Sequence, residues 1–319
     1  MAQGPEHNAG GRGGSDGLGG ADLTRDANFL THRGMVFTIA YDITGVVADA
    51  EDVVQETYLR WRAVPGPVEN PRAYLARIAA RQAMNLLRSA ARRREEYPGE
   101  WLPEPLPTGP GAGAPGFTSD PETAALTAAE VSTAMLVVLQ TLSGPERAAF
   151  VLHEVFGFGY PEIAEALDAG QPAVRQLVHR ARERVRTGVP RTAPDAAEHR
   201  AVVGRFLEAT LTGSVQALLD VLAPDVVLLS DGGGKANAAL RPVHGPEKVA
   251  RLMLGLASKY AAGAVPEFLE LNGLPAVAFR EEGTVTTVFQ ISLAGERVRG
   301  VYSMRNPDKL VHLQGPAVG

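Results

Sequence analysis

The sequence predicts a multidomain protein in which two all-α blocks are followed by a C-terminal α+β domain. Apolar residues recur at helical spacing in two separate segments, a stretch rich in proline and glycine lies between those segments, and strand-like alternation comes near the C-terminus. With 319 residues, the chain can form two or three domains that each bury a core. The expected boundaries are a disordered glycine-rich tail at 1–21, helical blocks at 22–97 and 122–188, linkers at 98–121 and 189–194, and the α+β domain at 195–319.

Composition narrows the class of protein. The formal net charge is −5, but charge is distributed unevenly, so local patches matter more than the total. The chain has no cysteine, which excludes disulfides and thiolate zinc sites, and its seven histidines show no metal-ligand spacing. We therefore expect no metal and no cofactor. No apolar run approaches the roughly 18–20 residues that span a bilayer, and no signal-peptide pattern is present, so we expect a cytoplasmic protein without a membrane partner.

The first helical block begins with an acidic amphipathic helix. Asp49 is a suitable N-cap, and Asp52 and Glu56 lie on one face of the helix that follows, with Arg60 placed to pair with Glu56. The apolar face consists of Val53, Val54, Tyr58 and Trp61. On periodicity alone, this segment is an ordinary solvated helix.

A strongly basic helix follows. Between residues 70 and 94 the chain has seven arginines and no acidic residue. The helical period places Arg77, Arg81 and Arg88 on one side, with Asn85 nearby. Arginine pairs with phosphates and stacks on bases, and asparagine bonds base edges, so this face suits a strand of nucleic acid. A solvated basic face is the alternative.

The second helical block has the pattern of a helix-turn-helix. After a helix that Ser143 can cap, Tyr160–Leu167 predicts a short helix, Gly170 marks a turn, and Gln171–Arg186 predicts a second helix. Residues 171–187 carry five arginines against one glutamate. Four basic residues recur on one face of that helix: Arg175, His179, Arg182 and Arg186. This pattern fits a helix that enters the major groove, whereas a helical hairpin with a solvated face is the alternative.

The C-terminal segment mixes helices and strands. Helical patterns cover His199–Leu211, Val215–Leu222 and Pro246–Tyr260. Alternation predicts strands at Thr284–Leu293 and Arg297–Arg305, joined by a hairpin turn at Ala294-Gly295. Helices followed by antiparallel strands are typical of an α+β domain.

These segments together resemble the sigma-70 family of transcription initiation factors. Ala48–Trp61, followed by Pro71–Ala79, resembles region 2 of that family, and Tyr160–Leu167 with Val174–Arg182 resembles region 4. Nothing resembles regions 1 or 3, so the chain is similar to the extracytoplasmic-function (ECF) sigma factors. This resemblance implies a promoter-specificity subunit, not an enzyme, whose partners are core RNA polymerase and promoter DNA.

Three further motifs resemble a subgroup of ECF sigma factors that is fused to a C-terminal SnoaL-like domain. They are the linker run Trp101–Leu106, the segment Asp231–Lys235 and the segment Asn306–Leu310. Taken alone, the last two read as plain turns. The resemblance implies that these motifs form an interface through which the third domain, a SnoaL-like cone, regulates the two helical blocks.

The resemblance also assigns roles to individual residues. It implies that core polymerase binds Asp49, Asp52, Gln55 and Glu56. It implies that the melted −10 element binds the loop 62–70 and the face of Arg77, Arg81, Asn85 and Arg88. It implies that the −35 duplex binds Gln171, Arg175, Gln176, His179, Arg182 and Arg186. It implies a regulatory interface made of Trp101, Leu102, Pro103, Glu104, Pro105, Leu106, Asp231, Lys235, Asn306, Pro307, Asp308, Lys309 and Leu310.

Other functions compete with this interpretation. A one-component helix-turn-helix regulator would answer to an unidentified small ligand in the cavity that SnoaL-like folds enclose. An enzyme with a nucleic-acid-binding appendage would need an acid or base in that cavity, and spacing alone does not bring the candidates Asp225, Asp231 and His244 together. Dependence on core polymerase separates a sigma factor from both.

Overall fold

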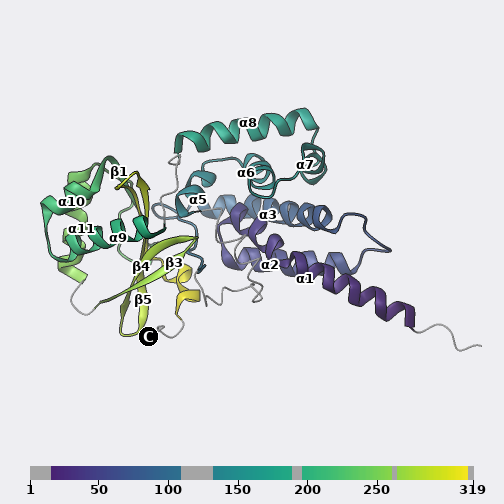
Figure 1. The fold of residues 1–319 in the computed structure, drawn as a ribbon, viewed down its shortest axis with the longest axis horizontal. Helices are drawn as coiled ribbons and strands as arrows, with labels where there is room; N and C mark the ends of the chain where they lie inside the picture. Colours follow the sequence, from purple (N-terminus) through teal and green to yellow (C-terminus); the bar gives the residue numbers. More distant parts are fainter. Residues whose placement is uncertain (1–15, 109–131, 189–195, 261–263, 315–319) are drawn as a thin grey trace, which may run out of the picture.

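The computed structural model describes residues 16–108, 132–188, 196–260 and 264–314 of the chain. Figure 1 shows two halves: a helical half, with α1, α2, α3 and α5 to α8, and a half in which a sheet packs with α9, α10 and α11. The multidomain fold class, all-α followed by α+β, is confirmed. Within the described ranges, every helix is too short or too polar to span a bilayer.

The first helical block contains three long helices. They are α1 (Asp16–Thr44), α2 (Val47–Arg62) and α3 (Pro71–Glu95). Helix α1 starts inside the segment expected to be a disordered tail, of which residues 1–15 lie outside the described part. Asp49 is not the N-cap of α2 but lies in its first turn, because Val46 occupies the cap position. The linker supplies the missing acceptor, since Oε2 of Glu104 accepts the N–H of Val47 at 2.8 Å.

The second helical block matches the predicted helix-turn-helix. Its helices are α5 (Thr133–Gln140), α6 (Gly144–Phe150), the π-helical turn Val151–Val155, α7 (Tyr160–Leu167) and α8 (Gln171–Gly188). Ser143 and Glu146 form a capping box at the start of α6, as the sequence predicts for Ser143. Asp168 ends α7 in the left-handed conformation with φ 52°, which turns the chain into α8.

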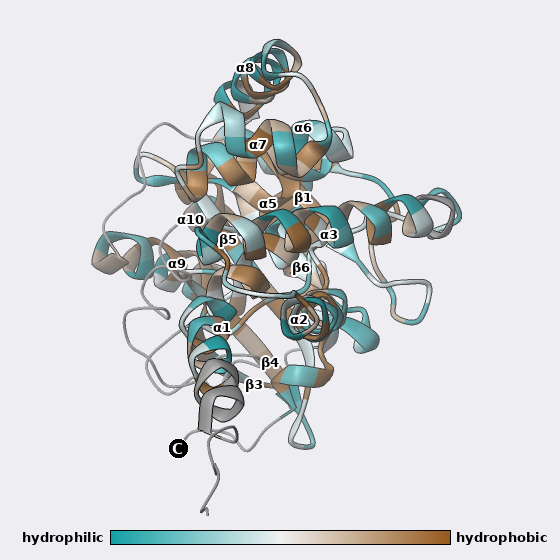
Figure 2. Cartoon of the chain, turned by 90° about the vertical axis from the view of Figure 1, so that its right-hand side faces the viewer, coloured by the Kyte–Doolittle hydropathy of each residue, from teal (hydrophilic) through white to brown (hydrophobic). Residues whose placement is uncertain are grey.

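Both helical blocks contribute to one hydrophobic cluster, although they are 35 residues or more apart in sequence. Leu75 and Ala79 of α3 belong to the same cluster as Leu136, Leu152 and Ile163. The hydropathy colouring in Figure 2 follows this packing, with hydrophobic residues between α3 and the helices above it. The linker that joins the blocks therefore does not separate them in this structure.

The C-terminal half is built on one mixed sheet. Its strands are β1 (Leu222–Asp231), β2 (Val243–His244), β3 (Val265–Leu271), β4 (Leu274–Glu281), β5 (Thr284–Ala294) and β6 (Arg297–Met304). Their order is β2-β1-β6-β5-β4-β3, and all neighbours are antiparallel except β1 and β6. The predicted hairpin of β5 and β6 is confirmed. The parallel pair was not predicted, because its two strands are joined by a long connection that includes α11 and four other strands.

The two faces of the sheet pack against different parts of the chain. One face is covered by α9 (Ala196–Leu211), α10 (Val215–Val221) and α11 (Pro246–Tyr260), which complete the α+β cone. The other face packs against Leu102 of the linker and Leu310 in the turn after β6. A single layer of strands thus lies between the interior of the cone and the linker.

Candidate nucleic-acid interface and domain interface

Helix α8 presents the predicted basic face to solvent. Its apolar stripe is buried, and the predicted contact residues are all exposed: Gln171, Arg175, Gln176, His179, Arg182 and Arg186. Arg182 pairs with Glu154 at 2.7 Å, and Arg175 lies 5.4 Å from the centre of the Tyr160 ring. The hydrogen bond to Glu154 is the main reason that the pKa of Arg182 is raised. This face is open to a nucleic-acid duplex, with Glu154 as a competitor for one arginine.

Two of the arginines on the basic face of α3 are bonded to α7. The side chain of Arg77 pairs with Glu165, and Arg81 donates hydrogen bonds to the carbonyl oxygens of Ala166 (2.8 Å) and Glu165 (2.6 Å). These carbonyls lie in the last turn of α7, where a helix carries partial negative charge. The end of α7 therefore offers these arginines the same chemistry as a phosphate group.

The rest of that face remains open. Asn85 and Arg88 are exposed and bonded to each other at 2.8 Å. Arg77 lies 4.8 Å from the centre of the Tyr74 ring, so an aromatic side chain accompanies the arginines even though none lies among them on the helix face. The predicted −10 residues share one face: Arg77 is half-buried, and Arg81, although exposed, is bonded to α7.

The acidic helix α2 presents a mixed face. Asp52 and Gln55 are exposed, Asp49 is half-buried, and Glu56 pairs with Arg60 at 2.6 Å. The predicted set leaves out Leu59, which is 63% exposed one and two turns beyond the acidic residues. A single exposed leucine is common on protein surfaces, so Leu59 alone does not mark a binding surface.

The interface between the cone and the helical half is centred on one buried carboxylate. We call the residues around it the Asp231 cluster: Tyr97, Leu102, Asp231, Asn306 and Lys309. Asp231 is fully buried and accepts from the Tyr97 hydroxyl at 2.5 Å, the Leu102 N–H at 2.9 Å and the Lys309 ammonium at 2.8 Å. Burial lowers the pKa of Lys309 to about 8, against the opposing charge of Asp231. Losing either partner of this ion pair would leave a buried charge uncompensated.

Trp101 connects the Asp231 cluster to the helical half of the protein. Its ring lies between two cations, with the Lys309 ammonium 3.8 Å and the Arg94 guanidinium 4.0 Å from the ring centre. Arg94, on α3, also donates to the Gln140 side chain at 2.7 Å and to the Thr44 carbonyl at 2.6 Å. One tryptophan thus connects the cone to α1, α3 and α5.

The glycines after Asp231 are required by this close packing. Gly233 and Gly234 have φ of 57° and 71°, which favours glycine. A Cβ atom on Gly233 would lie 2.3 Å from Nδ2 of Asn306, which itself donates to the Tyr97 hydroxyl at 2.8 Å. Lys235, at the end of this predicted motif, instead forms an exposed pair with Asp308, outside the buried cluster.

The linker segment Leu102–Leu106 packs between the sheet and the helical half. Leu102 belongs to the cluster on the sheet, whereas Leu106 belongs to the core of the helical half. Pro103 and Pro105 between them are buried, and proline has no N–H to leave unsatisfied there. Glu104 is bonded to the start of α2, and burial raises its pKa to about 7 although the hydrogen bond from Val47 opposes this shift.

A second polar centre, Asn272, was not predicted. Its side chain accepts from the Leu106 N–H, the Thr133 hydroxyl and the Gln290 amide, and it donates to the Tyr41 hydroxyl at 2.7 Å. It therefore joins the linker, both helical blocks and the sheet. Asn272-Gly273 was visible in the sequence only as a turn signal.

The acid and base candidates of the C-terminal half do not form a site. Asp225 pairs with Arg299 at 2.8 Å, Asp231 is held in its cluster, and His244 is exposed in β2. None of the three lines the apolar cavity of the cone. Among the described residues, His, Asp and Glu side chains form no group suited to a metal ion.

Two basic helical elements, one of them in a helix-turn-helix, define the class of protein as a DNA-binding transcription factor. Comparison with known proteins gives the family. Residues 29–93 match the model of Sigma-70 region 2, and residues 132–185 match that of Sigma-70, region 4. The chain belongs to the ECF RNA polymerase sigma factors of the sigma-70 family. Its function is that of a sigma factor, which binds core RNA polymerase and directs it to promoter DNA.

Individual relatives resemble the chain over most of its length. It is 38% identical to the ECF RNA polymerase sigma factor SigJ of Mycobacterium tuberculosis, over 89% of this chain and 92% of that protein. It is 29% identical to the probable ECF sigma factor SigI of the same species, over 92% and 97% of the two chains. The crystal structure of SigJ matches with a TM-score of 0.73 and 34% identity, over 90% of this chain and 98% of that one.

Proposed function

We propose that this sigma factor exists in a closed arrangement, in which α7 engages Arg77 and Arg81 of the −10 face and the cone holds α7 in place. In this proposal α2 docks on core polymerase through Asp52, Gln55 and Leu59. The face of Arg77, Arg81, Asn85 and Arg88 captures the melted −10 strand, and α8 reads the −35 duplex. The protein then acts in the cytoplasm, where polymerase transcribes.

One observation carries the proposal. Arg81 donates two hydrogen bonds to the carboxyl-terminal carbonyls of α7, and Arg77 pairs with Glu165 of the same helix. A phosphate backbone needs the same donors. Both partners cannot occupy these arginines together, so binding of the melted strand requires α7 to move away.

The cone supports this arrangement from the other side. Arg147 of α6 is buried and donates to the Ile43 carbonyl at 2.6 Å and to the Gln140 side chain at 2.9 Å. Gln140 also binds Arg94, whose guanidinium stacks on Trp101. The Asp231 cluster thus acts, through Trp101, on contacts that hold the second helical block against the first. We assign the cone this regulatory role and no catalytic one.

A reversible crosslink tests the proposal. Because the chain has no cysteine, the pair Arg77→Cys and Glu165→Cys can be joined by a reducible bis-maleimide across the α3–α7 contact. With core polymerase, the joined protein should fail to open a promoter, and after reduction it should regain the opening of the same double variant that was never joined. That unjoined double variant, which already lacks Arg77, is the control. Equal promoter opening in both states would contradict the closed arrangement.

A further inference from the structure

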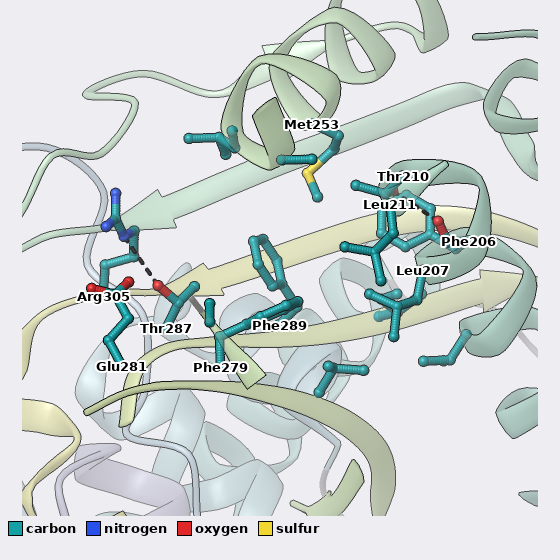
Figure 3. A pocket seen from close by; sticks show the side chains of 16 residues that line it. Phe206, Leu207, Thr210, Leu211, Met253, Phe279, Glu281, Thr287, Phe289 and Arg305 are labelled. Carbon is teal, nitrogen blue, oxygen red and sulfur yellow. Dashed lines mark hydrogen bonds between the residues drawn. The ribbon is translucent and has the colours of Figure 1, made fainter. Parts of the chain in front are cut away.

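The cone contains an apolar cavity between the sheet and two of its helices. Figure 3 shows Phe206, Leu207 and Leu211 of α9 at one end, with Phe289 of β5 and Met253 of α11 along the walls. The space between the walls measures about 720 Å³ including its open mouth. Without the open mouth, the cavity volume is about 70 Å³, so the cavity is narrow and suits a slender occupant.

The opposite end of the cavity is polar. Figure 3 shows that this end is lined by Glu281, Thr287 and Arg305. They lie together because the end of β4, the start of β5 and the end of β6 are adjacent in the sheet. Arg305 is held in place by Thr287, whose hydroxyl accepts from Nε at 3.3 Å, and by the Asn237 carbonyl, which accepts from Nη1 at 2.6 Å. Glu281 is exposed and is engaged by the Thr286 hydroxyl at 3.1 Å. This end therefore carries both a carboxylate and a guanidinium, and the guanidinium of Arg305 is the group held by hydrogen bonds to Thr287 and Asn237.

This polar end is joined to the Asp231 cluster through the main chain. The N–H groups of Arg305 and of its neighbour Asn306 both donate to the Asp231 carbonyl, at 2.7 and 3.0 Å. Asn306 in turn donates to Tyr97. Arg305 is therefore directly bonded to the Asp231 cluster, which contacts the linker.

The sheet makes a second connection. Along β4 and β5, alternate residues point to opposite faces. Val277 and Phe289 line the cavity, whereas Ala278 and Val288 belong to the cluster that packs on Leu102 of the linker. An occupant of the cavity would contact the same strands that support the linker from behind.

We propose that this cavity binds a slender aliphatic carboxylic acid, with its chain along Phe206, Leu207 and Phe289 and its carboxylate at Arg305. Apolar walls with one charged group at the end are the usual composition of a site for an amphipathic small molecule. Filling the cavity adds contacts to the strands behind the linker and removes none of the Asp231 cluster. We infer that the cavity keeps this shape only while the linker supports the strands from behind, so the acid binds the closed arrangement better and stabilises it. This coupling, but not the binding itself, rests on the function proposed above.

Binding is tested first, on the full chain, by calorimetry with decanoic acid, decanol and decyltrimethylammonium. We expect the acid to bind best and the ammonium ion worst. Arg305→Met should weaken the acid by about tenfold or more and the alcohol little, since a charge-assisted hydrogen bond is lost. Leu207→Trp, which fills the apolar end, should abolish binding of both. Absence of binding by all three probes, or equal binding of the acid and the ammonium ion, would overturn the site.

Coupling is tested separately by hydrogen exchange of the linker amides. A ligand that binds only the closed arrangement, at about ten times its Kd, should slow exchange of the Leu102 N–H by about tenfold. The Leu207→Trp variant, in which the site is blocked, should show no change when the acid is added. Binding without slower exchange would overturn the coupling and leave the site standing. Failure of the crosslinking experiment above, with binding intact, would overturn the closed arrangement alone.

Discussion

The two basic faces of this sigma factor differ in what their arginines contact. On α8 the arginines face solvent, whereas on α3 two of the four predicted contact residues bond the end of α7. The α8 face suits a duplex, which exists before transcription starts. The α3 face suits a melted strand, which forms only after polymerase has engaged. A face that is used later can be covered at first without loss of the earlier contact.

The largest expected effect comes from removing the charge of Lys309, the cation of the Asp231 cluster. Lys309→Met leaves the carboxylate of Asp231 buried and unpaired, so the free energy of unfolding should fall by about 3–5 kcal/mol. Urea denaturation measures this. The matched control is Lys235→Met, which breaks an exposed pair with Asp308 and should change stability by less than about 1 kcal/mol. Similar losses in both variants would show that the Asp231 cluster has no special role.

The next test compares the faces directly. Arg175→Ala should weaken binding of the −35 duplex by about 1–3 kcal/mol if its side chain meets a base edge. Arg81→Ala should leave duplex binding unchanged and impair promoter opening by holoenzyme. Duplex affinity and permanganate reactivity of the −10 bases report the two steps. If both variants lost both steps equally, the assignment of one strand state to each face would be wrong.

A pH dependence should accompany the linker. The pKa of Glu104 is about 7 in the folded chain against an ordinary value of 4.5, through burial above all, with Lys309 opposing and Asp49 reinforcing the shift. Between these two pH values the unfolded chain releases this proton while the folded chain keeps it. The contribution of Glu104 to the free energy of unfolding therefore falls as pH rises from about 4.5 to about 7 and stays constant above. Thermal unfolding of Glu104→Gln should lack this slope, and an unchanged slope would contradict the assignment.

The smallest effect concerns the cover itself. Glu165→Gln keeps the shape of the side chain and removes its charge opposite Arg77, a partly exposed pair worth about 0–1 kcal/mol. In the free protein this should raise affinity for single-stranded −10 DNA by a few fold, while −35 duplex affinity stays the same. Filter binding with each DNA measures the two affinities. A gain on the duplex as well would indicate a general charge effect and not an uncovered α3.

Local patterns account for what could be predicted. The face of α8 follows from helical spacing and a glycine turn, and the predicted bounds of α7, α11, β5 and β6 agree with the structure within a residue or two. The motif after Asp231 was assigned to an interface by resemblance, and its glycines have a steric reason that sequence spacing does not contain. Lys309, which the resemblance places at a regulatory interface, bonds the Leu102 carbonyl of the linker, and Asn306 bonds Tyr97; their regulatory role stays a prediction.

The partners of these residues could not be predicted. Arg81 meets Ala166 across 85 residues of sequence, and Tyr41 meets Asn272 across 231. Such pairs depend on how the halves pack, which no local periodicity encodes. For the same reason the sequence indicates a basic face on α3 but not that α7 covers part of it.

The position of Trp101 gives the protein its own optical gauge. The chain has two tryptophans, and the other, Trp61, lies within the core of the first helical block. In the opening proposed above, the half-buried indole of Trp101 would lose its contacts with Lys309 and Arg94 while Trp61 stays in its core, so only part of the emission spectrum should shift to the red. Intrinsic tryptophan fluorescence can therefore follow the rate of the proposed opening without an added dye.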